Sequence, residues 1–403
     1  MKEFHVQWHI TDTCNIRCID CYQEKYTTEM ELGWKNGLRT VCDNILETMR
    51  IWDSKLSVAL TGGEPLLKRE LRQIIEYLNA QDAVSKISII TNGTLIDRYI
   101  SELSGIKTAY RKFDKIFVSL DGVSPGVNDS IRGEGTFQKT VENVKLLVRE
   151  KMPVVIMFTL MKSNYADAGK LYNFCVDAGV DGFIIERFIP LGRGKKITGE
   201  VVTGAELDAL YRKILDTPDG GQGYGPNGEC ECFPGGTDYD PKEMVKYKAL
   251  YVQLKKTGAA SGRAPGVFGT GRGNEGRGTA GREDDGCGRA PSRTSRRYDT
   301  MPEFFGAECI VGRDGMAVLP DGTVLPCRRL PIPVGNLMSQ PLHQIWQSSK
   351  VLQDTRNKNN LKGKCNPKQC PVEACFGCRA MTYSLTGDYL AEDPHCNTPP
   401  FFI

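Results

Sequence analysis

The sequence has no long apolar run and almost no net charge. No stretch of its 403 residues approaches the roughly 18 consecutive apolar residues of a membrane span, and the amino-terminal MKEFHVQWHI lacks a secretion-signal core. Lysine and arginine number 52 against 49 acidic residues, and this net charge of +3 indicates no polyanionic partner for the whole molecule. These absences predict a cytoplasmic protein with neither a membrane nor a nucleic acid as its partner.

Histidine is scarce, with four residues, whereas the 15 cysteines are abundant. A secreted domain would use so many cysteines for disulfides, but this chain lacks a signal peptide and exceeds one ordinary domain in length. Closely spaced thiols in such a protein are more often metal ligands. Cys42 and Cys175 are exceptions, because each lies among apolar neighbours in a helix-like stretch and is expected to be a buried core thiol.

The first cysteine group is Cys14, Cys18 and Cys21, spaced C-x3-C-x2-C directly after an alternating apolar run at residues 4–10. Three thiolates at these offsets can converge on one face of a tight loop, and they leave one metal position open for substrate. A structural zinc knuckle and unrelated core cysteines are the alternatives. Because zinc sites favour paired cysteines with a closed fourth ligand, and none lies close by, the spacing favours an iron–sulfur site.

Short apolar runs alternate with amphipathic ones, which predicts an α/β fold of parallel strands and crossover helices. The predicted strands are residues 4–10, 56–60, 86–90, 115–120, 154–160 and 180–185, and the predicted helices include 66–78, 94–103, 137–149 and 165–178. This pattern fits an open doubly wound sheet or an incomplete barrel. The cysteine loop, TGGEP, TNG, SLDG and ERF each follow a strand, so we expect one ligand site at the carboxyl ends of the strands.

The strand-end motifs contain candidate binding residues, each with an ordinary structural alternative. Gly62, Gly63 and Glu64 form a turn that can expose backbone amides beside a carboxylate, or a simple βα turn with a surface acid. Ser119 and Asp121 offer a hydroxyl and a carboxylate suited to ribose, or a turn with a capping acid.

At the cysteine loop and the GGE and SLDG motifs the sequence resembles the radical S-adenosylmethionine (SAM) enzymes. The resemblance implies that Cys14, Cys18 and Cys21 hold a catalytic 4Fe-4S cluster whose open iron takes SAM. One electron from the cluster would cleave SAM reductively to a 5′-deoxyadenosyl radical, which abstracts hydrogen from a substrate carbon. The GGE motif would bind the SAM amine, and the SLDG segment would bind its ribose.

The resemblance also assigns three further residues to the cofactor. Arg132 would pair with the SAM carboxylate, an exposed loop arginine being the alternative, and Glu186 would serve the nucleoside or the substrate. The family usually has an aromatic residue before the third cysteine, but Asp20 stands there and Tyr22 follows instead. We therefore expect altered contacts around the adenine.

Residues 217–307 break the alternating pattern. A helix-like run at 242–254 precedes a Gly/Arg-rich tract at 262–297, whose few apolar side chains predict a flexible insertion. An arm that binds nucleic acid or an anionic substrate is the alternative. Cys230, Cys232 and Cys287 lie in this region and have no partner set.

The carboxyl-terminal segment contains a predicted hairpin at Asp321 and Gly322 and a second cysteine group. The group comprises Cys309, Cys327, Cys365, Cys370, Cys375, Cys378 and Cys396. Two four-ligand clusters need eight thiolates, so with seven one cluster is a ligand short or uses another ligand type. PDGTVLPC, GNL, CFGCRA and TGDYLAEDPHC resemble the SPASM domain of radical SAM enzymes. This resemblance implies two auxiliary iron–sulfur clusters, one on Cys309, Cys327 and Cys378 and one on Cys365, Cys370, Cys375 and Cys396.

These features predict three regions: a partial (β/α)6 barrel at 1–200, a linker with the flexible insertion at 201–306, and a small irregular α+β SPASM domain at 307–403. The predicted protein is an enzyme that modifies a peptide or protein or matures a peptide-derived cofactor, since such reactions dominate the SPASM group. The alternative is a tetrapyrrole side-chain decarboxylase of the haem pathway, because ERFIPLGRGK and TGDYLAEDPHC are similar to segments of that branch.

A non-enzymatic iron–sulfur electron carrier is the alternative of another class, although a carrier has no need of the GGE and SLDG motifs. The expected partners are a peptide or small-molecule substrate and an electron donor such as flavodoxin or ferredoxin. The first predicted strand begins at residue 4, so a peptide substrate is expected to need a separate recognition protein or direct capture.

Overall fold

A computed structural model describes residues 2–29, 31–215, 249–254, 303–307, 309–370, 372 and 375–396. Its sheet has the strand order β11-β10-β9-β1-β2-β3-β4-β5-β6-β7-β8, and β1 to β6 are parallel neighbours in chain order. These six strands are β1 (Lys2–Thr11), β2 (Ser54–Gly62), β3 (Val84–Thr91), β4 (Phe113–Ser119), β5 (Val154–Leu160) and β6 (Gly182–Arg187). The predicted α/β class with a parallel sheet is confirmed.

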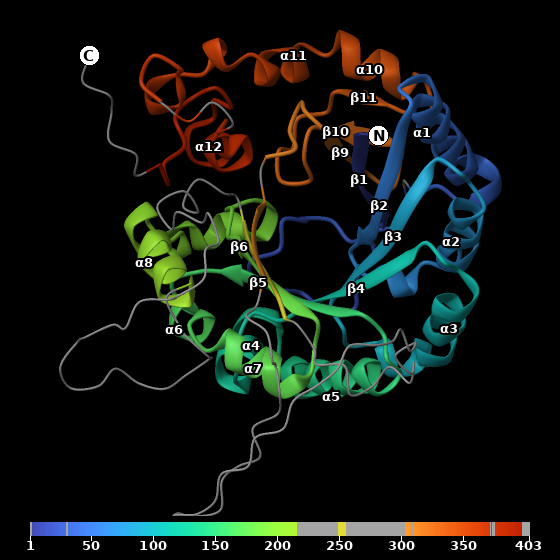
Figure 1. The fold of residues 1–403 in the computed structure, drawn as a ribbon, viewed down its shortest axis with the longest axis vertical. Helices are drawn as coiled ribbons and strands as arrows, with labels where there is room; N and C mark the ends of the chain where they lie inside the picture. The colour runs from blue at the N-terminus through green and yellow to red at the C-terminus, as the bar shows by residue number, and fades with distance from the viewer. Residues whose placement is uncertain are drawn as a thin grey trace, which may run out of the picture.

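Helices cover the outer face of this curved, open sheet (Figure 1). They are α1 (Arg39–Ile51), α2 (Leu71–Asn79), α3 (Ile96–Ala109), α4 (Pro125–Arg132), α5 (Thr136–Arg149), α6 (Tyr165–Ala168), α7 (Leu171–Ala178) and α8 (Gly204–Leu215). Short helices η1 (Trp34–Leu38), η2 (Pro65–Leu67) and η3 (Gly192–Glu200) lie in the connections.

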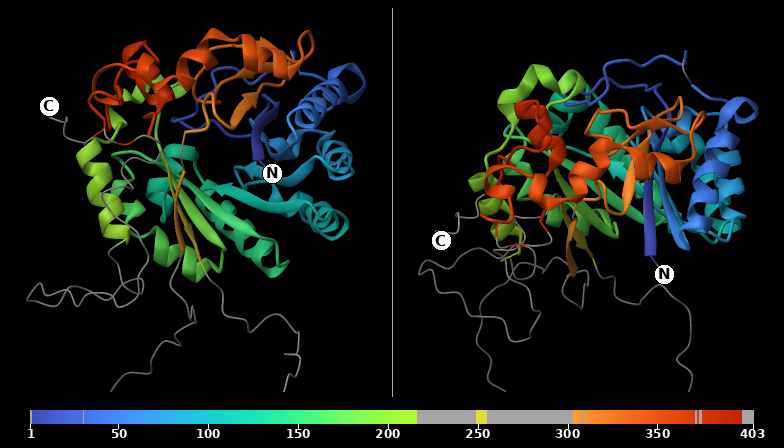
Figure 2. Two further views of the ribbon diagram at one scale, coloured as in Figure 1. Left: turned by 45° about the horizontal axis from the view of Figure 1, so that its top comes forward. Right: turned by 90° about the horizontal axis from the view of Figure 1, so that it is seen from above.

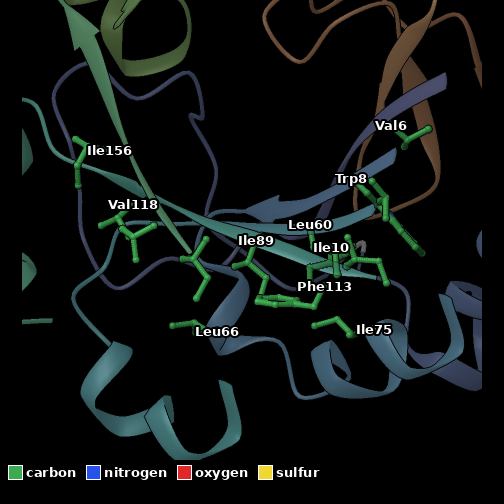
Figure 3. Close-up of a cluster of buried hydrophobic side chains, with 14 of the residues drawn as sticks. Val6, Trp8, Ile10, Leu60, Leu66, Ile75, Ile89, Phe113, Val118 and Ile156 are labelled. Carbon is green, nitrogen blue, oxygen red and sulfur yellow. The ribbon is translucent and has the colours of Figure 1, made fainter. Parts of the chain in front are cut away.

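The core lies between the strands and the outer helices. Figure 3 shows side chains of neighbouring strands, such as Trp8, Leu60 and Ile89, beside Ile75 of α2, and all four are fully buried. Burying a large apolar side chain contributes roughly 1.5–3 kcal/mol, so this layer stabilises the packing of the helices on the sheet. Cys42 and Cys175 are also fully buried, as expected for core thiols.

The carboxyl-terminal segment extends the same sheet at its β1 edge. β9 (Gly315–Val318) pairs in parallel with β1, and β10 (Thr323–Leu325) pairs antiparallel with β9 and with β11 (Gly335–Asn336). Gly322 has a φ of +84° in the turn, which supports the predicted hairpin at this position. The remaining elements are α10 (Leu342–Ser348), α11 (Lys350–Arg356), η5 (Lys358–Asn360), η6 (Gly363–Cys365) and α12 (Arg379–Thr386).

This segment also contacts the opposite edge of the parallel sheet. In both views of Figure 2 the orange and red segment lies next to β1 on one side and next to α8 on the other. Arg187, at the end of β6, donates from Nη1 to Oδ2 of Asp393 at 3.4 Å and to Nδ1 of His395 at 3.1 Å. Nε2 of His395 in turn lies 2.7 Å from the carbonyl oxygen of Val202. The carboxyl-terminal segment therefore spans the opening between β1 and β6.

The region predicted as a linker contributes regular structure to the fold. It provides α8, β7 (Ala249–Gln253), which pairs antiparallel with β6, and most of β8 (Glu303–Ala307). The helix-like run at 242–254 therefore ends in a strand, because β7 completes the ladder at the edge of β6. The tract at 262–297 and Cys230, Cys232 and Cys287 lie outside the described residues. No helix in the described residues is long and apolar enough to span a lipid bilayer.

Candidate active site

The strand-end motifs meet at one cavity, with about 940 Å3 of empty space including its open mouth. The predicted site residues on its wall are Cys14, Cys18, Cys21, Tyr22, Gly62, Gly63, Ser119, Arg132 and Glu186. Glu64 and Asp121 lie behind this wall and are fully buried. Most of these residues follow the carboxyl ends of the parallel strands, which is where α/β folds bind their ligands.

The GGE turn holds the start of the cysteine loop. The backbone amides of Gly63 and Glu64 donate to the carbonyl oxygens of Thr11 and Thr13, both at 2.8 Å. A Cβ on Gly62 would lie 2.2 Å from the Thr11 oxygen, and one on Gly63 would lie 2.3 Å from the Thr13 oxygen. The expectation that this turn exposes its amides is wrong for Gly63 and Glu64. The glycines are needed because the backbone of the cysteine loop packs directly against them.

The Glu64 carboxylate binds the end of β3. Oε1 accepts hydrogen bonds from Oγ1 of Thr91 at 2.7 Å and from the amide of Leu66 at 3.1 Å, and Oε2 accepts from the amide of Asn92 at 2.8 Å. Burial raises the pKa of Glu64 to about 7, and these hydrogen bonds oppose the shift. Both carboxylate oxygens are thus engaged with the protein, an arrangement that joins the β2 and β3 ends of the cavity.

Asp121 and Arg132 pair with each other. Nε of Arg132 donates to Oδ2 of Asp121 at 2.6 Å, and the amide of Thr159 donates to Oδ1 at 2.7 Å. Burial lowers the pKa of the Arg132 guanidinium, but the Asp121 carboxylate outweighs this and raises it above its ordinary value. We predicted that Asp121 binds ribose and that Arg132 binds a carboxylate. In the structure, Asp121 is occupied by protein donors, while Arg132 lines the cavity.

The three thiols of the first cysteine group share the cavity with protein donors that suit coordinated thiolates. Nδ2 of Asn92 lies 3.7 Å from Sγ of Cys14, and the amide of Gln23 lies 3.4 Å from Sγ of Cys21. Burial raises the pKa of the Cys18 thiol, and the nearby Arg132 guanidinium opposes the shift.

In the described residues no three His, Cys, Asp or Glu side chains could hold a single metal ion. A four-iron cluster does not need such convergence, because each thiolate binds a separate iron. The donor set therefore fits the cluster.

The carboxyl-terminal cysteines fall into two neighbourhoods. Cys327 and Cys378 are buried in one small apolar cluster, with Cys309 packed against it. The other neighbourhood contains Cys365, Cys370, Cys375 and Cys396, whose thiols perturb one another electrostatically. The amide of Asp393 donates to Sγ of Cys365 at 3.3 Å, a contact that suits a coordinated thiolate. The membership agrees with the two sets implied by the SPASM resemblance, and their assignment to clusters stays a prediction.

Several site residues were missed by the sequence analysis. Glu31 accepts from Oγ1 of Thr11 at 2.6 Å and from the amide of Asp12 at 2.8 Å, and Nζ of Lys68 donates to it at 3.1 Å. This buried group supports the entry to the cysteine loop, and nothing in the surrounding sequence marks it. Arg328 and Arg329 also line the cavity. Their position directly after Cys327 in LPCRRL was a usable signal.

The parallel α/β sheet carries a thiol loop and a cavity at its strand ends, and a cysteine-rich segment extends it. These features together are those of an iron–sulfur enzyme. Residues 8–175 match the model of the radical SAM superfamily, and residues 309–378 match that of the SPASM iron–sulfur cluster-binding domain. The chain belongs to the radical SAM superfamily and carries a SPASM domain.

Relatives match along nearly the whole chain. The AdoMet-dependent heme synthase of Methanosarcina barkeri is 27% identical over 97% of this chain and 95% of its own. The heme synthase of Nitratidesulfovibrio vulgaris is 22% identical over 98% and 92%, and the pre-heme d1 synthase of Dinoroseobacter shibae is 26% identical over 97% and 85%.

Solved structures show the same fold. Streptococcus suis SuiB with bound S-adenosylmethionine has a TM-score of 0.59 at 14% identity, covering 98% of this chain and 78% of SuiB. The structure of anSMEcpe with AdoMet and a peptide has a TM-score of 0.60 at 15% identity, covering 98% and 94%. The protein is accordingly an enzyme whose cofactors are a 4Fe-4S cluster, SAM and auxiliary iron–sulfur clusters.

Proposed function

We propose that this enzyme uses SAM-derived radical chemistry to decarboxylate a propionate side chain of a tetrapyrrole. The observation that carries the proposal is the match to AdoMet-dependent heme synthase over 97% of this chain and 95% of the relative. A match of this extent includes both the parallel sheet and the cysteine-rich segment. It favours the tetrapyrrole alternative over the peptide substrate that the sequence analysis preferred.

The chain's own residues would bind and orient the cofactor in this reaction. Cys14, Cys18 and Cys21 would hold the 4Fe-4S cluster, which supplies the electron that cleaves SAM. The carbonyl groups of the GGE turn would accept hydrogen bonds from the SAM amine. The amides of Gly63 and Glu64 already donate to the cysteine loop. The Ser119 hydroxyl would face the ribose, and Arg132, which Asp121 holds in place, would meet the SAM carboxylate.

For each propionate, one hydrogen atom would leave the side-chain carbon next to the ring and pass to the 5′-deoxyadenosyl radical. The carboxylate would then leave as carbon dioxide as the carbon–carbon double bond forms, and the one remaining electron would pass to an auxiliary iron–sulfur cluster. The electron that cleaves SAM would come from a reduced flavodoxin or ferredoxin. The carboxyl-terminal segment covers the opening between β1 and β6, where Arg187 binds Asp393, and would limit access of water to the radical.

The test is anaerobic incubation of the reconstituted protein with SAM, dithionite and iron-coproporphyrin III. We expect loss of one or two carbon dioxide units by mass spectrometry, with one 5′-deoxyadenosine formed per unit. Omission of SAM is the matched control. An unchanged tetrapyrrole, together with loss of two hydrogens from a peptide encoded beside this gene, would instead establish the peptide alternative.

A further inference from the structure

Two consecutive arginines on the cavity wall share one carboxylate. Nη2 of Arg328 donates to Oε2 of Glu186 at 2.9 Å, and Nη2 of Arg329 lies 3.5 Å from Oε1 of the same residue. The side chain of Arg328 is 13% exposed, that of Arg329 is 9% exposed and that of Glu186 is 15% exposed. Two guanidinium groups therefore share one hydrogen-bonded carboxylate in a nearly buried place.

We propose that Arg328 and Arg329, positioned by Glu186, form a subsite that binds a carboxylate of the substrate. This assignment rests on the proposed function, because a propionate-bearing tetrapyrrole supplies the anion. Planar guanidinium groups bind carboxylates through paired hydrogen bonds, and a buried cation without a partner is costly. A bound carboxylate would accept hydrogen bonds from the guanidinium donors that Glu186 leaves unused.

The arginine pair has donors to spare for such a ligand. An arginine carries five N–H groups, and hydrogen bonds with Glu186 and Tyr22 do not use all of those on Arg328. Arg187, which lines the same cavity, has a buried Nε with no acceptor among the described residues. This part of the wall therefore offers more donors than acceptors, as a site for an anion requires.

The subsite lies between the two cysteine groups. The Arg328 guanidinium stacks 5.1 Å from the centre of the Tyr22 ring, and the Tyr22 hydroxyl donates to the carbonyl oxygen of Gly62 at 3.2 Å. On the other side the amide of Arg329 lies 3.5 Å from Sγ of Cys327. A carboxylate bound here would stand beside the proposed SAM site, where the side chain to be oxidised must lie.

The competing role for the pair is to balance the charge of a cluster on Cys327. The two roles differ in what Arg328→Gln and Arg329→Gln change. A substrate subsite affects the affinity for the carboxylate ligand, whereas a charge-balancing role affects cluster content and SAM cleavage without substrate. Arg212→Gln, which alters a surface ion pair with Asp208 on α8, is the matched control.

The test compares binding of coproporphyrin III and of its tetra-amide to anaerobic, reconstituted protein by porphyrin fluorescence. Wild type and Arg212→Gln should bind the tetra-carboxylate roughly 10- to 100-fold more tightly than the amide, the range for charge-assisted hydrogen bonds. In Arg328→Gln and Arg329→Gln this ratio should approach one. Iron content should stay at the wild-type level in both variants.

Unchanged ratios in both variants, or joint loss of iron and of uncoupled SAM cleavage, would overturn the subsite while leaving the proposed function intact. Wild-type protein that binds no coproporphyrin III would overturn the ligand assigned to the subsite, whereas only an unchanged iron-coproporphyrin III in the incubation with SAM would overturn the proposed function. If Arg328→Gln does not fold, Arg328→Lys serves instead. Because lysine keeps the charge but loses the paired geometry, it should reduce the ratio only in part.

Discussion

Asp121 and Arg132 are joined by a 2.6 Å hydrogen bond between Oδ2 and Nε at the carboxyl-end side of the sheet. Asp121 is fully buried, and only 10% of the Arg132 side chain is exposed. The pair connects the end of β4 to α4, so that one residue faces the cavity and the other holds it there. Two residues that the sequence suggested as separate ligands thus act as one unit.

Replacing the carboxylate of this pair should destabilise the fold and weaken SAM binding. Asp121→Ala leaves a buried guanidinium without its partner, which costs about 3–5 kcal/mol. We expect a lower midpoint of thermal unfolding and a higher Kd for SAM, measured by equilibrium dialysis. Asp114→Asn, which changes a surface ion pair with Lys115, is the control. A wild-type midpoint and Kd in Asp121→Ala would contradict the role of the pair.

Gly63→Ala should prevent formation of the first cluster. A Cβ at this position would lie 2.3 Å from the carbonyl oxygen of Thr13, so the cysteine loop must move. Iron and sulfide analysis should find one cluster fewer per chain than in wild type. Gly105→Ala on α3 has no atom within 4 Å of its new Cβ and should keep every cluster. Full iron content in Gly63→Ala would disprove this account of the turn.

Removing the first cysteine group should remove its cluster and leave the auxiliary clusters in place. In the triple variant Cys14→Ala, Cys18→Ala, Cys21→Ala, one cluster should be lost and the auxiliary signals should remain in electron paramagnetic resonance spectra. Formation of 5′-deoxyadenosine should fall to background, because the electron for SAM cleavage comes from that cluster. Loss of all clusters at once would show that the two groups do not bind independently.

Asp129 should make stability depend on pH in acid. Partial burial raises its pKa, but hydrogen bonds, the largest from the amide of Phe137 at 2.7 Å, lower it below the ordinary value of 3.8. The stabilisation by the charged group is therefore present above pH 3.8 and is lost as the pH falls through the lowered pKa of the folded protein. Because the Asp129 carboxylate accepts from the amides of Gly135 and Phe137 at the start of α5, Asp129→Asn should lower the free energy of unfolding at neutral pH.

Urea unfolding of wild type and Asp129→Asn at several pH values tests this expectation. The difference in the free energy of unfolding should narrow as the pH falls below 3.8. A difference that stays constant into acid would mean that the charge of Asp129 contributes nothing.

The sequence predicted the parts of the fold that follow from local pattern. Six apolar runs became the six parallel strands, and polar motifs after them met at one cavity because parallel strands share a carboxyl edge. Pairing within the site was not predictable in this way. Asp121 and Arg132 are each plausible ligands, and only packing brings them together.

Contacts between segments that are distant in the sequence were also not predictable. β7 is a strand because it completes the edge of β6, which a local pattern at residues 242–254 cannot reveal. Glu31 and Lys68 form a buried ion pair across 37 residues, and neither lies in a recognisable motif. Arg328 was passed over because its partner, Glu186, comes from the opposite edge of the parallel sheet.

Hydrogen transfer from a labelled substrate tests the central claim most directly. Iron-coproporphyrin III carrying deuterium on the propionate carbons next to the ring would be incubated anaerobically with the enzyme, SAM and dithionite. The account predicts one deuterium in each 5′-deoxyadenosine and loss of the matching carboxylate as carbon dioxide. Unlabelled 5′-deoxyadenosine and an intact tetrapyrrole would contradict it.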